Sequence, residues 1–484
     1  MSRPNVLLIC AEHWSGRFLG IEGHPCLQTP TLDRIARNGV RFINAYSATP
    51  TCIPARRSLM TGMNAQSHGD RIFKEHEPMP KAPTLAGAFA DAGYLTSAIG
   101  KLHVYPQRDR IGFHAVRLHE EGRRHLGMNG DDYEMFVADA GYAGQEYTHG
   151  MSANDYMSRA WHLPERLHPT NWTVETTCRA IRRRDPTRPS FWFMSFSAAH
   201  PPFIPPETYL SLYDTDKMDP ALIGDWAADP DALPYALRIR RGGWYTQGHH
   251  FLRDPHLLAQ SRAAYYAMCT HVDHQIRLAI GTLREEGILD DTIVMFVADH
   301  GEMLGNHGLF AKDVMYEDSA RIPMIIMPTA DDDRWSHHRA DERLADISDV
   351  MPTLLEMAGI PVPDTVDGLS LCGSETRPHL YCEHWEDARA SRMIRDDRYK
   401  LIYYAIGNRT QLFDLKEDPD ELHDLSDTGD QREVLDRMTS LLIDHLYGDD
   451  REWIRDGRLE GLEDRPFSPT PDRGLGGQRG WRFV

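Results

Sequence analysis

The amino-acid sequence predicts an α/β protein with a large, mostly parallel sheet flanked by helices, and a smaller antiparallel sheet plus a helix near the C-terminus. Continuous apolar runs, which are typical of strands buried on both faces, recur up to about residue 327. Segments with helix caps and apolar stripes separate several of these runs. From about residue 371 the pattern changes to short alternating segments, which indicate antiparallel strands.

Five apolar runs are predicted to form strands of the large sheet. They are Asn5 to Ala11, Tyr94 to Ile99, Phe191 to Ala198, Ile293 to Ala298 and Ile322 to Met327. The first run is bounded by Pro4 and Glu12, so its ends are well defined. The first four runs lead directly into histidines, lysines or carboxylates.

Helices are predicted between these strands. Thr31 and Thr84 are interpreted as N-caps of two short helices, which Gly39 and Gly93 end. A long helix from about Ser261 to Glu286 carries one apolar stripe and therefore packs against the sheet. The segments 105–188, apart from a helix in the 170s, and 203–258 are interpreted as long loops.

The chain is predicted to divide into three parts. Residues 1–370 form the α/β domain, and residues 371–447 form the antiparallel sheet with a helix over about 431–446. Residues 448–484 are read as a polar C-terminal arm. The arm ends in the apolar segment Trp481 to Val484, which we expect to dock on a second copy of the chain in a homo-oligomer.

The composition excludes several classes of protein. The net charge of −19 over 484 residues argues against nucleic acid or an anionic membrane as a partner. The apolar run near the N-terminus is too short to span a membrane, so a cytoplasmic protein is expected. The seven cysteines are odd in number and lack paired spacing, which favours neither a disulfide framework nor a cysteine zinc site.

The segment TPTCIPARRSLMTG, residues 49–62, is the most informative in the chain. Pro54 suits the first turn of a helix and Gly62 suits its end, so Cys52 is predicted at a helix N-terminus. The exposed N–H groups of that turn, together with Arg56, would stabilise a thiolate or an oxyanion at residue 52.

Chemically active residues follow four of the predicted strands. The carboxyl ends of parallel strands meet at one edge of a sheet, where ligands bind, so we expect these side chains to share one crevice with Cys52. They are Glu12, His13, Lys101, His103, His200, Asp299 and His300.

These residue types fit a metal-assisted displacement. Glu12 and Asp299, with imidazole from His13 or His300, form a mixed oxygen and nitrogen set that would hold a divalent cation beside residue 52. A tetrahedral anion would be bound by three cations, which are Arg56, Lys101 and Lys312. His103 and His200 can donate protons. The pattern therefore predicts displacement at a sulfur or phosphorus centre by a nucleophile on residue 52.

The segment TCIPARRSLMTG resembles the signature of the sulfatase family, in the alkaline phosphatase superfamily, whose pattern is C-x-P-x-R with a following TG. The resemblance continues in the same order through GYLTSAIGKLH, AAHPPF, VADHGEMLGNHGLFAK, RDDRYKLIYY and LFDLKEDPDEL, and so covers most of the chain. It implies an alkaline phosphatase-like fold and hydrolysis of a small-molecule sulfate ester. It also implies that a formylglycine-generating enzyme converts Cys52 to formylglycine, one hydroxyl of whose hydrate attacks the sulfur while the other later expels sulfate.

The resemblance also implies roles for single residues. Arg56 would support the formylglycine, Lys101 and Lys312 would grip the sulfate oxygens, His103 would assist breakdown of the adduct, and His200 would protonate or orient the leaving-group oxygen. The metal ligands would be Glu12, Asp299, His300 and residue 52.

The chain departs from the family at the end of its first strand. Two aspartates are usual there, whereas this chain has Glu12 and His13. Calcium, which is common in the family, prefers oxygen ligands, and an additional imidazole favours manganese or zinc. At this point His13 is either a ligand or a support for one.

Two alternatives remain at the level of sequence. The first is a phosphonate monoester or phosphodiester hydrolase with the same formylglycine site. Lys101 and His103 favour the sulfatase, whereas the Asp299–His300 pair and the low carboxylate count favour the alternative. The second is a non-catalytic binding protein in which Cys52 stays a thiol, and the clustered basic and imidazole side chains argue against it.

Overall fold

The structure is a computed structural model that describes residues 3–123, 126–127, 130–151, 155–241, 254–335, 337–386 and 388–465. The apolar end of the predicted arm, Trp481 to Val484, lies outside the described residues. No helix in the described ranges is long and apolar enough to cross a membrane.

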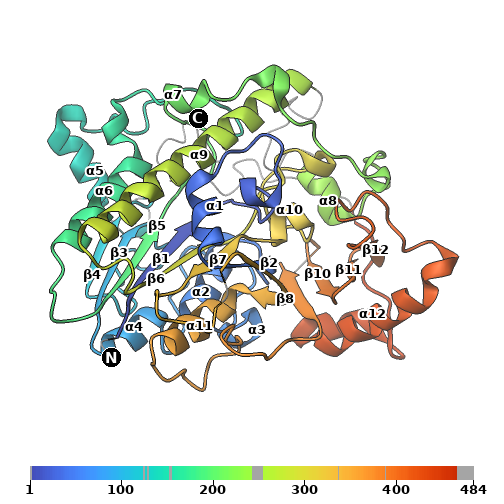
Figure 1. The fold of residues 1–484 in the computed structure, drawn as a ribbon. Coiled ribbons are helices and arrows are strands. Elements are labelled where there is room, and N and C mark those ends of the chain that lie inside the picture. The colour runs from blue at the N-terminus through green and yellow to red at the C-terminus, as the bar shows by residue number, and fades with distance from the viewer. Residues whose placement is uncertain are drawn as a thin grey trace.

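An eight-stranded sheet runs through the molecule (Figure 1). Its order is β4-β3-β5-β1-β6-β7-β2-β8, and only β7 runs antiparallel to its neighbours. The strands are β1 Asn5–Ala11, β2 Val40–Tyr46, β3 Leu95–Gly100, β4 Ala115–Leu118, β5 Ser190–Ser195, β6 Thr292–Ala298, β7 Met324–Met327 and β8 Arg339–Asp346. The predicted large, mostly parallel sheet is confirmed.

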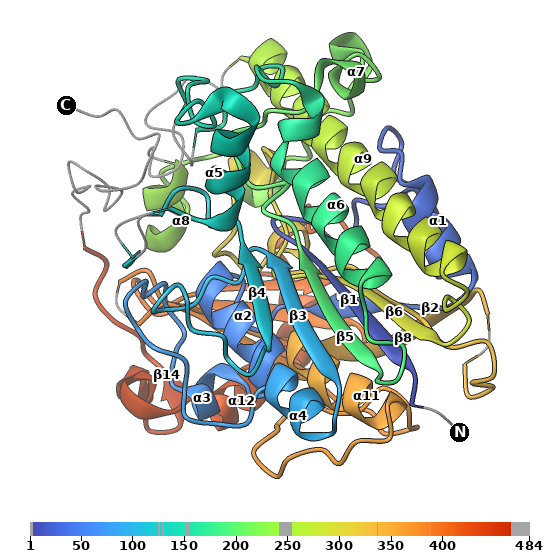
Figure 2. The same cartoon turned by 90° about the vertical axis from the view of Figure 1, so that its left-hand side faces the viewer.

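The central strands are apolar throughout because helices cover both faces of the sheet. Every residue of β5 and β6 is buried, and β1 lies between these two strands. Figure 2 shows α1, α6 and α9 on one face and α2, α4 and α11 on the other. Their bounds are α1 Pro30–Arg37, α2 Cys52–Thr61, α4 Leu85–Asp91, α6 Pro169–Arg182, α9 Pro255–Glu285 and α11 Val350–Met357.

Three strands were missed by the apolar-run criterion. β8 has the sequence RADERLAD and lies at the sheet edge, where charged side chains reach solvent. β4 is a four-residue strand at the opposite edge, and β2 carries polar residues at several half-buried positions. The predicted strand from Ile322 begins at Met324.

One predicted helix cap is wrong and one is confirmed. The Thr84 hydroxyl accepts a hydrogen bond from Gly87 N at the start of α4. Thr31 instead lies inside α1, which begins at Pro30. The Asp273 carboxylate of α9 accepts the N–H groups of Thr31 and Leu32 at 2.9 and 2.7 Å, so a distant helix supplies the cap.

The segments predicted to be loops contain short helices that the hydrophobic periodicity of the sequence does not indicate. They are α5 Asp132–Val137, α7 Glu207–Leu210 and α8 Tyr235–Ile239. Two further short α-helices of the described chain are α3 Ala65–His68 and α10 Glu317–Ala320.

A second, antiparallel sheet lies beside β8 (Figure 1). Its order is β12-β11-β10-β9, and α12 packs on it. The elements are β9 Leu380–His384, β10 Ser391–Arg395, β11 Tyr399–Tyr404, β12 Arg409–Asp414 and α12 Arg432–His445. The predicted C-terminal sheet is confirmed, with β10 as an additional strand.

Buried ion pairs join the two sheets. The Nζ of Lys400, on β11, lies 2.6 Å from Glu317 Oε1 of α10. The hydroxyl of Tyr46, on β2, donates a hydrogen bond to the same carboxylate at 2.6 Å. Asp450, which follows α12, pairs with Arg71 and Arg392. Residues 448–465 therefore pack against the body of the protein.

Candidate active site

The ends of four parallel strands lie at one edge of the large sheet. Ala11 of β1 pairs with Ala298 of β6, Cys10 with Ser195 of β5, and Gly100 of β3 with the same serine. The residues that follow these ends are therefore neighbours. Glu12, His13, Lys101, His103, His200, Asp299 and His300 are all buried there, as expected from the topology.

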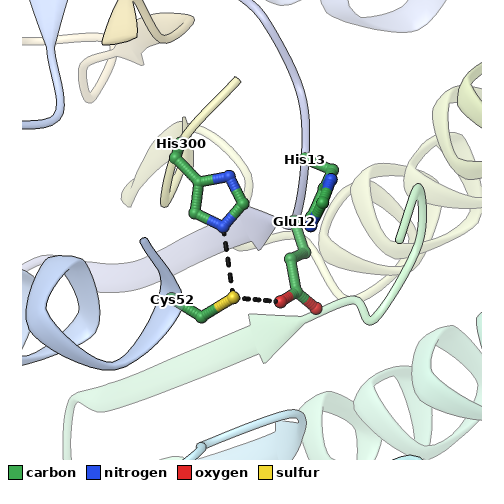
Figure 3. A group of neighbouring side chains, drawn as sticks. All are labelled: Glu12, His13, Cys52 and His300. Atoms are coloured by element: carbon green, nitrogen blue, oxygen red, sulfur yellow. Dashed lines mark hydrogen bonds between the residues drawn. The ribbon is translucent and has the colours of Figure 1, made fainter. Parts of the chain in front are cut away.

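Cys52 is the first residue of α2 and lies against two of these residues. Its Sγ is 2.9 Å from Glu12 Oε1 and 3.2 Å from His300 Nε2, as Figure 3 shows. The side chain is only 1% exposed. Burial raises the pKa of the Cys52 thiol well above its usual value, although Lys312 and Lys101 act in the opposite direction. The unmodified thiol is therefore a poor nucleophile near neutral pH.

Four side chains form a group that could hold a cation. Ligand atoms of Glu12, His13, Cys52 and His300 lie within 4.8 Å of one another. A carboxylate and two imidazoles around residue 52 match the donor chemistry of a divalent cation. Burial acts to raise the pKa of Glu12, but the charges of Lys101, His200 and Arg56 together lower it well below its usual value and keep the carboxyl ionised.

Asp299 lies next to this group and is paired with Arg56. Arg56 Nε donates to Asp299 Oδ2 at 2.8 Å, and a second guanidinium nitrogen donates to Lys101 O and Ser195 Oγ, each at 3.0 Å. Asp299 Oδ1 lies 3.6 Å from His300 Nε2. Arg56 therefore links the helix of Cys52 to three strand ends.

The two predicted anion-binding lysines lie on opposite sides of the group. Lys101 contacts Glu12 through Nζ and lies 2.7 Å from Glu121 Oε2. Lys312 Nζ lies 2.6 Å from His13 Nε2. Both lysines are buried, so their charges act across the site with little screening by solvent.

His103 and His200 lie at the same edge, buried among charged side chains. Neither ring nitrogen of His103 hydrogen-bonds to the described residues. Burial, reinforced by the Arg123 charge, lowers its pKa well below the usual value. His200 Nδ1 donates to Pro201 O at 2.6 Å, and burial lowers its pKa to about 3. Both imidazoles are neutral near pH 7.

Two carboxylates of the site were missed from the sequence. Glu121 binds Lys101 and also lies 2.6 Å from an Arg123 guanidinium nitrogen. It belongs to an irregular segment without a recognisable motif. Glu302 binds His13 Nδ1 at 2.7 Å and stands three residues after Asp299, so its place in the DHGE run was an available signal.

A pocket adjoins the site and shares Glu121 and His200 with it. Its wall combines tyrosine, tryptophan and histidine rings with aliphatic residues and two carboxylates, Glu121 and Glu146, and much of it comes from the segment 119–168. Other lining residues include His119, Tyr133, His149, Trp161 and His168. No lysine or arginine of the described chain lines this pocket.

Comparisons with known proteins identify the family of the chain. The family model "Sulfatase" matches residues 4–360, and the model "N-sulphoglucosamine sulphohydrolase, C-terminal" matches residues 305–446. An arylsulfatase of Clostridium perfringens is 35% identical over 475 residues, covering 94% of this chain and 97% of that protein. A choline-sulfatase of Rhizobium meliloti is 28% identical, covering 88% of this chain and 83% of its own.

Solved structures share the fold. A phosphonate monoester hydrolase of Agrobacterium radiobacter superposes with a TM-score of 0.77 at 24% identity, covering 96% of this chain and 100% of that one. This likeness concerns the architecture alone. The family match and the arylsulfatase relative go further, and the chain belongs to the sulfatase family of the alkaline phosphatase superfamily, as a sulfuric ester hydrolase.

Proposed function

We propose that this protein hydrolyses a small-molecule sulfate ester, using a formylglycine made from Cys52 and one divalent cation. The observation that carries the proposal is the position of Cys52 Sγ, 2.9 Å from Glu12 and 3.2 Å from His300 at the start of α2. The sulfur stands in for an oxygen of the modified side chain. When bound, the cation would lower the pKa of that oxygen and neutralise charge on the ester.

The thiol itself does not suit the reaction. Burial raises the pKa of Cys52, so almost no thiolate is present near pH 7. A sulfated thiol would also have no second hydroxyl with which to release sulfate. These two points support oxidation of Cys52 by a formylglycine-generating enzyme, which we place with this protein in the cytoplasm.

The buried cations would bind the sulfate group. Lys101 and Lys312 flank residue 52, and Arg56 holds Asp299 and the strand ends in place. Charges held in a dry site stabilise the charge that develops on the sulfuryl oxygens without reorganisation. Loss of any one should lower kcat more than it raises KM.

The histidines would handle protons on the leaving-group side. His200 Nδ1 is bonded to Pro201 O, which leaves Nε2 for the ester oxygen. A bound anion beside the ring would raise the pKa of this imidazole and bring it closer to the protonated form that a general acid requires. His103, whose ring nitrogens have no hydrogen-bond partner in the described chain, is available for breakdown of the sulfated intermediate.

The adjoining pocket would receive the alcohol part of the ester. Tyr133, Tyr147 and Trp161 supply aromatic surface. Burial lowers the pKa of His149 to about 4 and that of His168 to about 3, so both are neutral at pH 7. No lysine or arginine of the described chain lines the pocket, whereas Glu121 and Glu146 do, so it favours an uncharged aromatic or apolar alcohol over a polyanionic sugar.

The proposal is tested by mass spectrometry and turnover together. The tryptic peptide of Cys52 from cells with a formylglycine-generating enzyme should show the thiol-to-aldehyde mass loss, and the same preparation should hydrolyse an aryl sulfate. If the protein hydrolyses the ester while Cys52 is still a thiol, formylglycine is not the nucleophile. If Cys52 is modified but the protein does not hydrolyse the aryl sulfate, the proposed substrate class is wrong.

A phosphonate monoester or phosphodiester hydrolase is the second candidate. The Asp299–His300 pair and the fold shared with phosphonate monoester hydrolases favour it. Comparing kcat/KM for an aryl sulfate and an aryl phosphonate of the same phenol decides between them. We expect the sulfate to be preferred, and a preference for the phosphonate would reverse the assignment.

A further inference from the structure

His13 occupies a specified position between a carboxylate and the centre of the site. It follows β1, is fully buried, and has a backbone φ of 54°, in the left-handed region that non-glycine residues rarely adopt. Its Nδ1 lies 2.7 Å from Glu302 Oε2. Its ring packs edge-on against those of His200 and His300, with centroids 4.5 and 4.6 Å away. The imidazole is therefore held from several sides.

Glu302 accepts hydrogen bonds from four groups. The Tyr156 hydroxyl donates to Oε2 at 2.7 Å, and the backbone N–H groups of Leu304 and Ala311 donate to Oε1 at 2.9 and 2.7 Å. His13 Nδ1 supplies the fourth. Burial raises the pKa of Glu302 to about 7, and in its ionised form the carboxylate can only accept, which places the proton of the His13 ring on Nδ1.

The opposite ring nitrogen therefore carries the lone pair. Lys312 Nζ lies 2.6 Å from His13 Nε2, and an ammonium group can only donate. This second contact assigns the same tautomer independently, and a cation bound at Nε2 would take the place of the Lys312 ammonium there. His300 is arranged similarly, because its Nδ1 donates to Gly301 O at 3.0 Å and leaves Nε2 toward Cys52.

We propose that His13 is a ligand of the cation through Nε2, that Glu302 is the residue that positions it, and that the resulting pair of imidazoles selects manganese or zinc over calcium. The inference rests on the cation site of the proposed function. The ligand atoms of His13 and His300 lie with those of Glu12 and residue 52 inside 4.8 Å (Figure 3). Calcium prefers six to eight oxygens, whereas imidazole suits transition metals.

A different role for His13 makes an opposite prediction. The ring could serve only to link Lys312 to Glu302 in a buried hydrogen-bond chain. In that case removal of the imidazole would change the position of Lys312 but not the affinity for a cation. Cation binding therefore separates the two roles without any measurement of turnover.

The test uses the full-length mature protein, stripped of metal with a chelator and titrated with MnCl₂ or CaCl₂ by calorimetry. Nitrogen coupling in the pulsed EPR spectrum of bound Mn²⁺ counts the imidazole ligands. His13→Asp replaces one imidazole with a carboxylate that can still bind a cation. Glu302→Gln keeps the His13 imidazole and removes only the carboxylate that holds it in place. His307→Gln is the matched control, because His307 is buried in the loop that also contains Glu302. Its Nδ1 accepts a hydrogen bond from Gly224 N.

Wild-type protein should bind Mn²⁺ more tightly than Ca²⁺ and show two coupled imidazoles. His13→Asp should show one coupled imidazole, and its relative affinity for Ca²⁺ over Mn²⁺ should be higher than that of wild type. Glu302→Gln should weaken Mn²⁺ binding about 10- to 100-fold, the usual cost of losing a support of a metal ligand. His307→Gln should match wild type.

The inference is overturned if His13→Asp keeps the wild-type nitrogen coupling and Mn²⁺ affinity, or if wild type prefers Ca²⁺. Circular dichroism of each stripped variant checks folding, and His13→Asp alone decides the ligand if Glu302→Gln does not fold. Two coupled imidazoles in a protein without sulfatase activity would refute the proposed function and leave this assignment intact. Sulfatase activity with one coupled imidazole would refute only this assignment.

Discussion

The ammonium group of Lys101 lies 2.7 Å from Oε2 of Glu121, a carboxylate on the side of the leaving-group pocket. Lys101 also contacts Glu12, so it sits between one carboxylate of the cation group and one of the pocket wall. Arg123 binds the same Glu121 oxygen and compensates its charge. Glu121 therefore holds the lysine that we propose binds the sulfate.

Glu121→Gln should lower kcat/KM for an aryl sulfate by about 10- to 100-fold, because a misplaced Lys101 loses contact with the developing charge. The ionised form of Glu121 is the native one, since Lys101 and Arg123 outweigh burial and lower its pKa. Steady-state kinetics measure the change. Glu285→Gln, at an exposed position, is the control, and equal activity of both variants would show that Glu121 does not position Lys101.

Cys52→Ala should reduce kcat by at least about 10⁴-fold, as expected when a nucleophile is removed. The reason is that no other described side chain lies at the start of α2 between Glu12 and His300. Single-turnover kinetics with an aryl sulfate check it. Circular dichroism must match wild type, and substantial residual turnover would mean that residue 52 is not the nucleophile.

The thiol of unmodified Cys52 should react slowly with iodoacetamide at pH 7–8. Burial raises its pKa, so the thiolate fraction appears only at higher pH than for an ordinary cysteine, and the side chain is 1% exposed. Peptide mass spectrometry over a pH series follows the labelling. The more accessible Cys26 is the internal comparison. Faster labelling of Cys52 than of Cys26 at pH 7 would contradict the burial argument.

A negative charge on the alcohol part of the ester should lower kcat/KM. The sulfate ester of 4-hydroxyphenylacetamide should have a kcat/KM about tenfold or more above that of 4-hydroxyphenylacetate, because the carboxylate would be buried without a cation. The two phenols are close in reactivity, so the comparison isolates the pocket. Trp161→Lys should narrow the ratio by adding a positive charge to the wall. Equal rates for both esters with wild type would rule out this description of the pocket.

Lys400→Met should destabilise the protein by about 3–5 kcal/mol, the usual cost of leaving buried carboxylates without their partner. Lys400 binds Glu317 of the large domain and Glu421 of the C-terminal part at 2.6 and 2.7 Å. Urea unfolding at pH 7 measures the change. Lys416→Met, which removes an exposed pair with Asp397, should stay within about 1 kcal/mol. Equal losses of unfolding free energy in the two variants would mean that the buried Lys400 ion pairs stabilise the protein no more than an exposed ion pair does.

Sequence patterns were most informative where the residues themselves dictate local structure. Strands buried on both faces must be apolar throughout, so β1, β5 and β6 were recognised, whereas the charged edge strand β8 was not. Thr84 was recognised as a cap because its own hydroxyl makes the bond. Thr31 was misread because the cap of α1 comes from Asp273, far away in the sequence.

By itself, the sequence determined the family and the residues that follow the buried strands, and it pointed to Cys52 as the candidate nucleophile. Cys52, Arg56 and the residues after each buried strand follow local rules of helix starts and parallel sheets, which need no knowledge of distant partners. Only the tertiary structure decided which side chain meets which. The Glu121–Lys101 and Glu302–His13 contacts join residues that are 20 and 289 positions apart, and it is their burial against one another that fixes the orientation of these side chains.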